Sequence, residues 1–169
     1  NTFLNVGLND KIVKDLSKQP NFGWTAWDCY RRFLQNWGMA YGMDRDVFDK
    51  IMLDFKSKYK VEQKMEFTPQ QMKIVAQAYQ KVLFEHDIHF EDDPFLQLRQ
   101  AVFSVIDSWD SDRAKVYREN LQIASEWGTA VIVQKMVLGN INDNSGSGVV
   151  FTQDPYREGV NLYGDFTFC

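Results

Sequence analysis

The sequence predicts an α+β fold in which a mostly helical lobe, residues 1–126, precedes a small antiparallel sheet within residues 127–169. Along the first part, apolar residues recur every three or four positions, which is typical of amphipathic helices that share a core. From Trp127 onward the pattern changes to short β-branched and apolar runs separated by polar turns, which is typical of adjoining strands. Because helices and strands are segregated along the chain, the pattern favours an α+β fold.

Three helices are expected before residue 60. Asn9 or Asp10 is the expected N-cap of a short first helix. The second, at about 22–41, carries the most aromatic face of the chain. That face consists of Trp24, Trp27, Tyr30, Phe33, Leu34 and Trp37. Asp44 is the expected cap of the third helix, whose apolar residues again recur at helical spacing.

Three further helices are expected after residue 67. The Thr68–Gln71 segment has a hydroxyl cap, a proline at the first helical position and a glutamine three residues after the cap, so it predicts a helix start. This fourth helix should end near Glu85. Pro94 opens a fifth that ends near Trp109, and the sixth begins at about Ser111. The rings expected to be largely buried in this lobe are Trp24, Trp27, Trp37, Phe48 and Phe103.

The C-terminal part is expected to form three strands. They are predicted within Trp127–Gly139, after a Ser145–Gly148 turn, and at about Asn161–Asp165. A sheet this short needs a covered face, so it either packs on the helices or forms the edge of a larger sheet. The loop from Asn140 to Gly148 holds glycines whose backbone N–H groups can approach an anion, but its composition also fits an ordinary hairpin connection.

Composition excludes some classes of function. The net charge of −4 offers no basic field for nucleic acid as the main partner. No apolar run approaches the roughly 18 residues of a membrane span, and no leader pattern is present. With 44% hydrophobic and 15% aromatic residues, we expect a packed globular protein that is soluble and cytoplasmic, without a nucleic acid or membrane partner.

The cysteines and histidines are few. Cys29 and Cys169 form neither a disulfide framework nor a metal-binding spacing, and Cys29 is expected to be a buried free thiol in the second helix. His86 and His89 are three residues apart, which could place both on one helix face. Since they fall where the fourth helix should end, positions at a helix terminus or in a loop are favoured over a metal site.

Several short motifs occur in a fixed order along the chain. They are Thr2–Asp10, Tyr30–Phe33, Ser108–Asp110, Arg113-Ala114, Tyr117-Arg118, Gly128–Val131, Gln134, Met136-Val137, Ser145–Val149, Phe151-Thr152 and Tyr163–Asp165. Together they resemble the N-terminal nucleotide-binding domain of pyruvate phosphate dikinase, from the first residue almost to the last. The resemblance implies part of an ATP-grasp-like domain. In such a parent enzyme, ATP with Mg²⁺ phosphorylates a catalytic histidine on a separate domain, and phosphoenolpyruvate and pyruvate are interconverted.

The resemblance also implies an adenine-binding edge, formed by Gln134 and the backbone of Lys135, Met136 and Val137. A carbonyl beside an N–H matches the amine donor and ring-nitrogen acceptor of adenine, and the methionine supplies a polarizable apolar wall. The alternative is that Met136 and Val137 are core positions of a strand.

Two further sets of residues follow from the resemblance. Phosphate-proximal positions are Arg32, Ser145, Gly146, Ser147 and Gly148. For Arg32 the alternative is an exposed charge on an aromatic helix. Arg113 and Asp165 match positions that dock the phosphohistidine domain, although aspartate replaces the usual glutamate and Tyr156 stands where a smaller polar residue is common.

No catalytic residue or metal ligand is identified within the chain. The family's glycine-rich lysine segment, its Arg-Ser-Gly-Ala and Asn-Ala-Gln-Gly-Glu stretches and its later acidic metal ligands do not occur in these residues. The acidic clusters Asp44–Asp49 and Glu91–Asp93 resemble helix caps and solvated faces. We therefore expect this fragment alone not to complete phosphoryl transfer. The alternative is a non-catalytic helical interaction or regulatory module that retains the fold.

Overall fold

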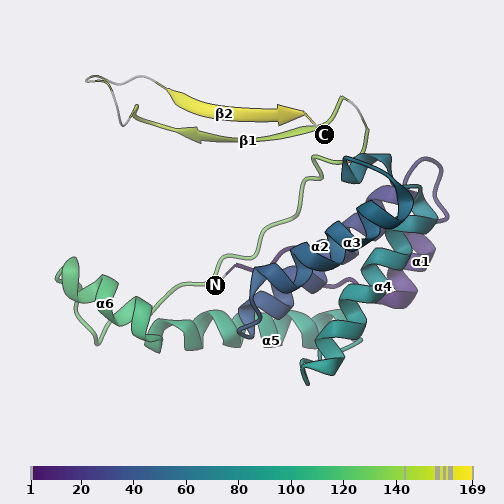
Figure 1. Ribbon diagram of the computed structural model, residues 1–169. Helices are drawn as coiled ribbons and strands as arrows, with labels where there is room; N and C mark the ends of the chain where they lie inside the picture. Colours follow the sequence, from purple (N-terminus) through teal and green to yellow (C-terminus); the bar gives the residue numbers. More distant parts are fainter. Residues whose placement is uncertain (1, 143, 155–156, 158, 160–161, 169) are drawn as a thin grey trace. The chain divides into compact units, whose positions relative to one another are not determined.

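The computed structural model describes residues 2–142, 144–154, 157, 159 and 162–168. The chain divides into two compact units, Asn1–Met136 and Val137–Cys169. The first unit is helical and the second holds a two-stranded antiparallel hairpin (Figure 1). This secondary structure is the predicted α+β combination.

The helical unit contains six α-helices and two 3₁₀ turns among its described residues. They are α1 (Asp10–Leu16), α2 (Gly23–Ala40), α3 (Arg45–Tyr59), η1 (Lys64–Glu66), α4 (Pro69–Glu85), α5 (Pro94–Asp107), η2 (Ser108–Asp110) and α6 (Asp112–Asn120). None of these helices is long and apolar enough to cross a membrane.

The predicted helix starts are supported by capping hydrogen bonds. The side chain of Asn9 accepts from the backbone N–H of Ile12 at 2.8 Å. Thr68 and Gln71 form a reciprocal capping box, with distances of 3.2 and 2.7 Å. Asp44 occupies the N-cap position of α3, but its side chain makes no capping hydrogen bond. The caps at Asn9 and Thr68 fix where α1 and α4 begin, because each satisfies a backbone N–H that the helix itself leaves unpaired.

The core of this unit lies between α2 and α4. As predicted, Trp27, Trp37 and Phe48 are buried, and Trp24 is half-buried. The prediction for Phe103 is wrong, since 51% of this residue is exposed.

The exposure of Phe103 follows from the way α5 is attached. The helix buries only Gln97 and Ala101. The amide of Gln97 accepts from the N–H of Gly7 at 2.8 Å and donates to the carbonyls of Leu8 and Glu91 at 2.9 and 2.8 Å. A buried polar side chain therefore joins α5 to the unit, and much of its apolar face remains uncovered by the described residues.

The hairpin consists of β1 (Gly146–Phe151) and β2 (Tyr163–Phe168), paired antiparallel with Gly146 opposite Phe168. The prediction of a strand within residues 127–139 is wrong, because these residues form no strand. Their β-branched composition favours an extended chain, but a strand exists only where a neighbour completes its ladder, and the structure pairs β1 with β2 alone among the described residues. The third predicted strand begins later than expected, at Tyr163, and Asn161 lies outside the described residues.

The glycine-rich turn is also placed differently from the prediction. Gly146 and Gly148 lie within β1. The turn ends at Ser145, whose N–H donates to the carbonyl of Asn142 at 2.8 Å, and the side chain of Asn142 accepts from the N–H of Asn144 at 3.0 Å. Glycine is needed in the strand because the opposing backbone approaches closely. A Cβ atom would lie 2.7 Å from the carbonyl of Asp165 at Gly148, and 2.3 Å from that of Val149 at Gly164.

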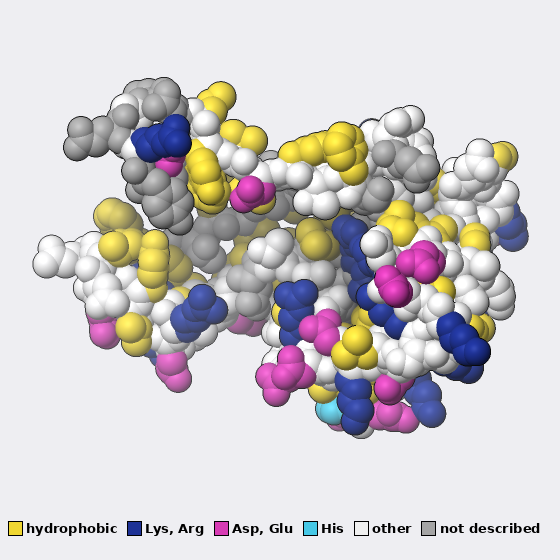
Figure 2. All heavy atoms as spheres, turned by 45° about the horizontal axis from the view of Figure 1, so that its top comes forward, with side chains coloured by type: hydrophobic (Ala, Val, Ile, Leu, Met, Phe, Trp, Pro, Cys, Tyr) yellow, Lys and Arg dark blue, Asp and Glu magenta, His cyan; other side chains and the backbone are white. Residues whose placement is uncertain are grey.

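The hairpin exposes apolar side chains on both strands, as the yellow surface in Figure 2 shows. The exposed large residues in β1 and β2 are Val149, Val150, Phe151, Tyr163, Phe166 and Phe168. A two-stranded sheet is marginally stable in water unless a face is covered. We therefore expect the apolar side chains of the hairpin to pack against a further surface, as in a larger sheet.

Candidate functional site

The predicted adenine edge lies in an irregular, exposed stretch of the chain. Gln134 to Val137 belong to no helix or strand, and Met136 and Val137 are 42% and 89% exposed. Among the residues that the structure describes, the backbone groups of this segment have no hydrogen-bond partner. The segment thus presents unused carbonyl and N–H groups beside a methionine, the combination that a purine edge requires. Neither Met136 nor Val137 is buried as a core position.

The predicted phosphate turn is only partly a turn. Ser145 remains in the loop, where its hydroxyl contacts the side chain of Asn142 at 3.3 Å. Gly146, Ser147 and Gly148 are strand residues, paired with Phe168, Thr167 and Phe166 respectively. Their backbone is therefore extended and held in a ladder, which differs from the open concave loop that cradles a phosphate. Of the predicted loop residues, Ser145 alone keeps a turn position.

Arg32 lies in the middle of α2 and is held by a buried carboxylate. Its Nε atom is 3.0 Å from Oδ2 of Asp28, whose side chain is fully buried. The Arg32 side chain is 36% exposed, so it is neither a core residue nor a free surface charge.

Asp28 is shared by two further cations. The guanidinium of Arg31 contacts its Oδ1 through Nε at 2.9 Å and through a terminal nitrogen at 2.8 Å. The ammonium of Lys64, from η1, lies 3.8 Å from Oδ2. Burial by itself would raise the pKa of Asp28, but the charges of Arg31, Lys64 and Arg32, with the hydrogen bond from Arg31, hold that pKa below its usual value. Asp28 is therefore an ionised carboxylate inside the helical unit.

This cluster was not anticipated from the sequence. Arg31 and Arg32 follow Asp28 by three and four residues in a helical segment, and that spacing was a usable signal for an ion pair. Lys64 comes from a different segment, and no local pattern connects it with Asp28.

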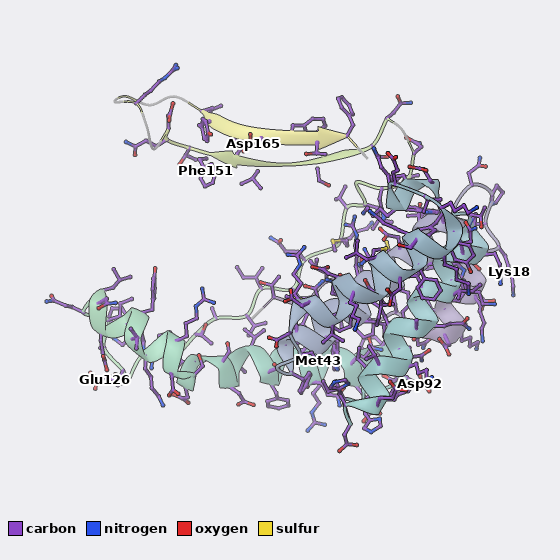
Figure 3. All side chains as sticks on the ribbon, in the orientation of Figure 1. Lys18, Met43, Asp92, Glu126, Phe151 and Asp165 are labelled. Atoms are coloured by element: carbon purple, nitrogen blue, oxygen red, sulfur yellow. The ribbon has the colours of Figure 1, made fainter. Side chains whose placement is uncertain are left out.

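The two predicted docking residues are both exposed. Arg113 lies in the first turn of α6 in the helical unit. Asp165 lies on β2, opposite Val149 of β1 (Figure 3). Tyr156 lies outside the described residues.

A Mg²⁺ ion in a phosphotransferase prefers carboxylate oxygens together with the phosphates of a substrate. Within the described residues, no group of three or more His, Cys, Asp or Glu side chains is placed to hold a metal ion. The described residues therefore do not fit a Mg²⁺ site. His86 lies at the C-cap of α4, and Cys29 is buried, both as predicted.

Comparison with known proteins identifies the wider relationship. Residues 1–163 match the family model described as "Pyruvate phosphate dikinase, AMP/ATP-binding domain". The chain is 39% identical to pyruvate, phosphate dikinase of Rhizobium meliloti (strain 1021) and to the chloroplastic enzyme of Flaveria trinervia, over 98% of its own length in each case. It is 37% identical to pyruvate, phosphate dikinase of Clostridium symbiosum, again over 98% of its length.

These relatives are much longer than the chain, which covers 19%, 17% and 19% of their respective lengths. The family match extends over nearly all of the sequence and includes the Arg32 helix, the Gln134–Val137 segment and β1. The chain therefore belongs to the pyruvate phosphate dikinase AMP/ATP-binding domain family.

Proposed function

We propose that the chain is part of the ATP-binding domain of a pyruvate phosphate dikinase-like phosphotransferase. The parent enzyme would use ATP and Mg²⁺ to phosphorylate a histidine on another domain of the same chain, and would interconvert pyruvate and phosphoenolpyruvate in the cytoplasm. The observation that carries the proposal is the open backbone edge of Gln134–Val137, which lies within the region matched by the family model.

The proposed roles follow the chemistry of each group. The Gln134–Val137 backbone would bind the adenine edge, and Met136 would contact the ring. Arg32 would contact a phosphate, since a guanidinium forms strong paired hydrogen bonds with phosphate oxygens. Ser145 and the adjoining Gly146, Ser147 and Gly148 would lie near the phosphates. Arg113 and Asp165 would contact the histidine-bearing domain.

The chain alone is expected to bind ATP only weakly. It has the proposed adenine edge and Arg32, but among its described residues no group of three or more His, Cys, Asp or Glu side chains is placed to hold Mg²⁺. Isothermal titration calorimetry with ATP and Mg²⁺ measures this directly. Saturable binding tighter than about 1 μM, which corresponds to about 8 kcal/mol, would require contacts that the chain does not supply. Such binding, or conversion of ATP to AMP by the chain alone, would contradict the prediction.

The adenine assignment predicts a kinetic effect in the longer enzyme. Replacing Met136 by aspartate places an unpaired carboxylate against the purine, so the Michaelis constant for ATP should rise about tenfold or more. The half-reaction of the phosphohistidine enzyme with pyruvate uses a different active site and should be unaffected.

The matched control is Met136→Leu, which keeps the apolar wall and nearly the same volume, and should leave the Michaelis constant for ATP almost unchanged. A Met136→Asp enzyme that folds and retains normal ATP kinetics would remove the adenine assignment. Loss of both half-reactions together with a lower melting temperature would show instead that Met136 is a core residue of the intact enzyme.

A further inference from the structure

We propose that Arg118 is a positioning residue that holds α6 in place and thereby presents Arg113 to the histidine-bearing domain. The inference rests on the proposed docking role of Arg113, and it adds Arg118 and its partner Trp109 to that role. All three residues belong to the helical unit. Arg118 is only 4% exposed, so it acts through the helix that carries Arg113 and not by contact with another domain.

The α6 helix buries very little of its own surface. It is nine residues long, and an isolated helix shorter than about 12 residues is marginally stable in water. Arg118 is its only buried residue, and Ala114 is half-buried. The other side chains of α6 are exposed, Arg113 among them. The contacts of Arg118 are therefore the main attachment of α6 to the described part of the helical unit.

Arg118 reaches back to Trp109, which lies nine residues earlier in the η2 turn. The central carbon of its guanidinium lies 4.1 Å from the centre of the Trp109 ring, and a terminal nitrogen donates to the Trp109 carbonyl. The Nε atom of Arg118 is buried and has no hydrogen-bond partner among the described residues. The ring face and this one carbonyl therefore stabilise a buried positive charge.

The contact between Arg118 and Trp109 closes a short loop that contains Arg113. Trp109 precedes Arg113 by four residues, and Arg118 follows it by five. At the start of α6, Ser111 is the N-cap, and its hydroxyl donates to the carbonyl of Ser108 at 2.8 Å. This cap orients the first turn of α6, and the Arg118–Trp109 contact fixes the last turn. Arg113 lies between the two restraints, so its position depends on both.

Lysine at position 118 would keep the charge but lose the contact. A planar guanidinium can stack on an indole while it donates to a carbonyl, whereas an ammonium is a compact and more strongly hydrated charge. Arg118→Lys therefore separates the geometry from the charge. The matched control is Arg99→Lys on α5, because the Arg99 guanidinium lies 5.5 Å from the centre of the Phe103 ring and both residues are exposed.

The first measurement is amide hydrogen exchange of this chain, which does not depend on the docking role. We expect Arg118→Lys to raise the exchange rates in α6 about tenfold and to leave those of α2 and α4 unchanged. Arg99→Lys should leave all three helices unchanged. Equal exchange of α6 in the Arg118→Lys variant and in the unmodified chain would overturn the proposal, because the contact would then not hold the helix.

The second measurement is the formation of phosphohistidine from ATP by the longer enzyme. Arg113→Gln and Arg118→Lys should each lower the rate at saturating ATP about tenfold or more, because the two domains would be misaligned. The Michaelis constant for ATP and the half-reaction with pyruvate should be unchanged in both variants. A general loss of fold would reduce both half-reactions, so this difference separates positioning from a purely structural role.

The outcomes distinguish the inference from the proposed function. Loss of phosphohistidine formation in both variants, with Arg99→Lys normal, supports the positioning role. A normal rate for Arg113→Gln would remove the docking role and the inference that rests on it. A loss for Arg113→Gln but not for Arg118→Lys would keep the docking role and overturn the positioning role. Loss of both half-reactions in Arg118→Lys would also overturn it, since Arg118 would then be required for the fold itself.

Discussion

Replacing Trp37 by alanine is expected to lower the free energy of unfolding of the helical unit by about 3–5 kcal/mol. Trp37 is fully buried, and its ring centre lies 5.2, 5.3, 5.6 and 6.3 Å from the rings of Phe3, Phe33, Tyr41 and Phe90. Its indole N–H also donates to the carbonyl of His89 at 3.2 Å. The substitution would leave a cavity among rings from several segments and remove a donor from a partly buried carbonyl. Urea unfolding followed by helical circular dichroism measures the loss.

Trp127→Ala provides the matched control for this substitution. Trp127 has the same side chain, but 65% of it is exposed and it lies in the irregular stretch after the helices. We expect its replacement to change the unfolding free energy by no more than about 0.5 kcal/mol. Equal losses for Trp37→Ala and Trp127→Ala would contradict the aromatic core between α2 and α4.

The helices were predictable because their signals are local. The capping box of Thr68 and Gln71 and the cap at Asn9 act within three residues of the helix start, so the sequence itself contains both partners of each hydrogen bond. The buried face of α2 was predictable for a similar reason, since the 3.6-residue period places its aromatic rings on one side.

Two predictions were wrong, the strand within residues 127–139 and the burial of Phe103, and they share a different physical cause. β-Branched residues within 127–139 favour an extended chain, but a strand also needs a neighbour, and the neighbour is not specified by local sequence. The same holds for Phe103. Periodicity identifies the apolar face of α5, but it does not show whether another segment covers that face, and the structure attaches this helix through Gln97 instead.

The candidate site combines contacts that a local spacing predicts with a contact that depends on the tertiary structure. The resemblance to a known family selected Arg32, and its contact with Asp28 follows from their spacing of four residues in α2. The contribution of Lys64 depends on where η1 lies relative to α2, which is a tertiary property. Sequence reasoning therefore found Arg32 and missed the buried carboxylate of Asp28 and its contact with Lys64.

Replacing Asp28 by asparagine is expected to lower the free energy of unfolding at neutral pH by about 3–5 kcal/mol. Asparagine keeps the volume of aspartate but removes the charge, so Arg31, which is only 6% exposed, would remain buried without its counter-charge. Chemical denaturation measures the loss. Asp15→Asn is the control, because Asp15 pairs with Lys18 at 2.8 Å on the surface, where both side chains are mostly exposed, and its replacement should have little effect. Comparable losses for both variants would contradict the central role of Asp28.

The pH dependence of this loss tests the cause that we assign to it. The pKa of Asp28 in the folded chain lies below its ordinary value of 3.8, because the three cations and the Arg31 hydrogen bond outweigh the larger individual effect of burial. The unfolded chain therefore binds a proton at this carboxyl first as the pH falls. The stability that ionised Asp28 contributes is fully present above about pH 4 and is lost as the pH falls from there through the folded-state pKa. The difference in unfolding free energy between the unmodified chain and Asp28→Asn should consequently be constant between about pH 5 and 8. It should shrink as the pH falls below about 4. A difference that grows as the pH falls from about 7 to 5 would place the folded-state pKa above the ordinary value, and would mean that burial prevails over the cations.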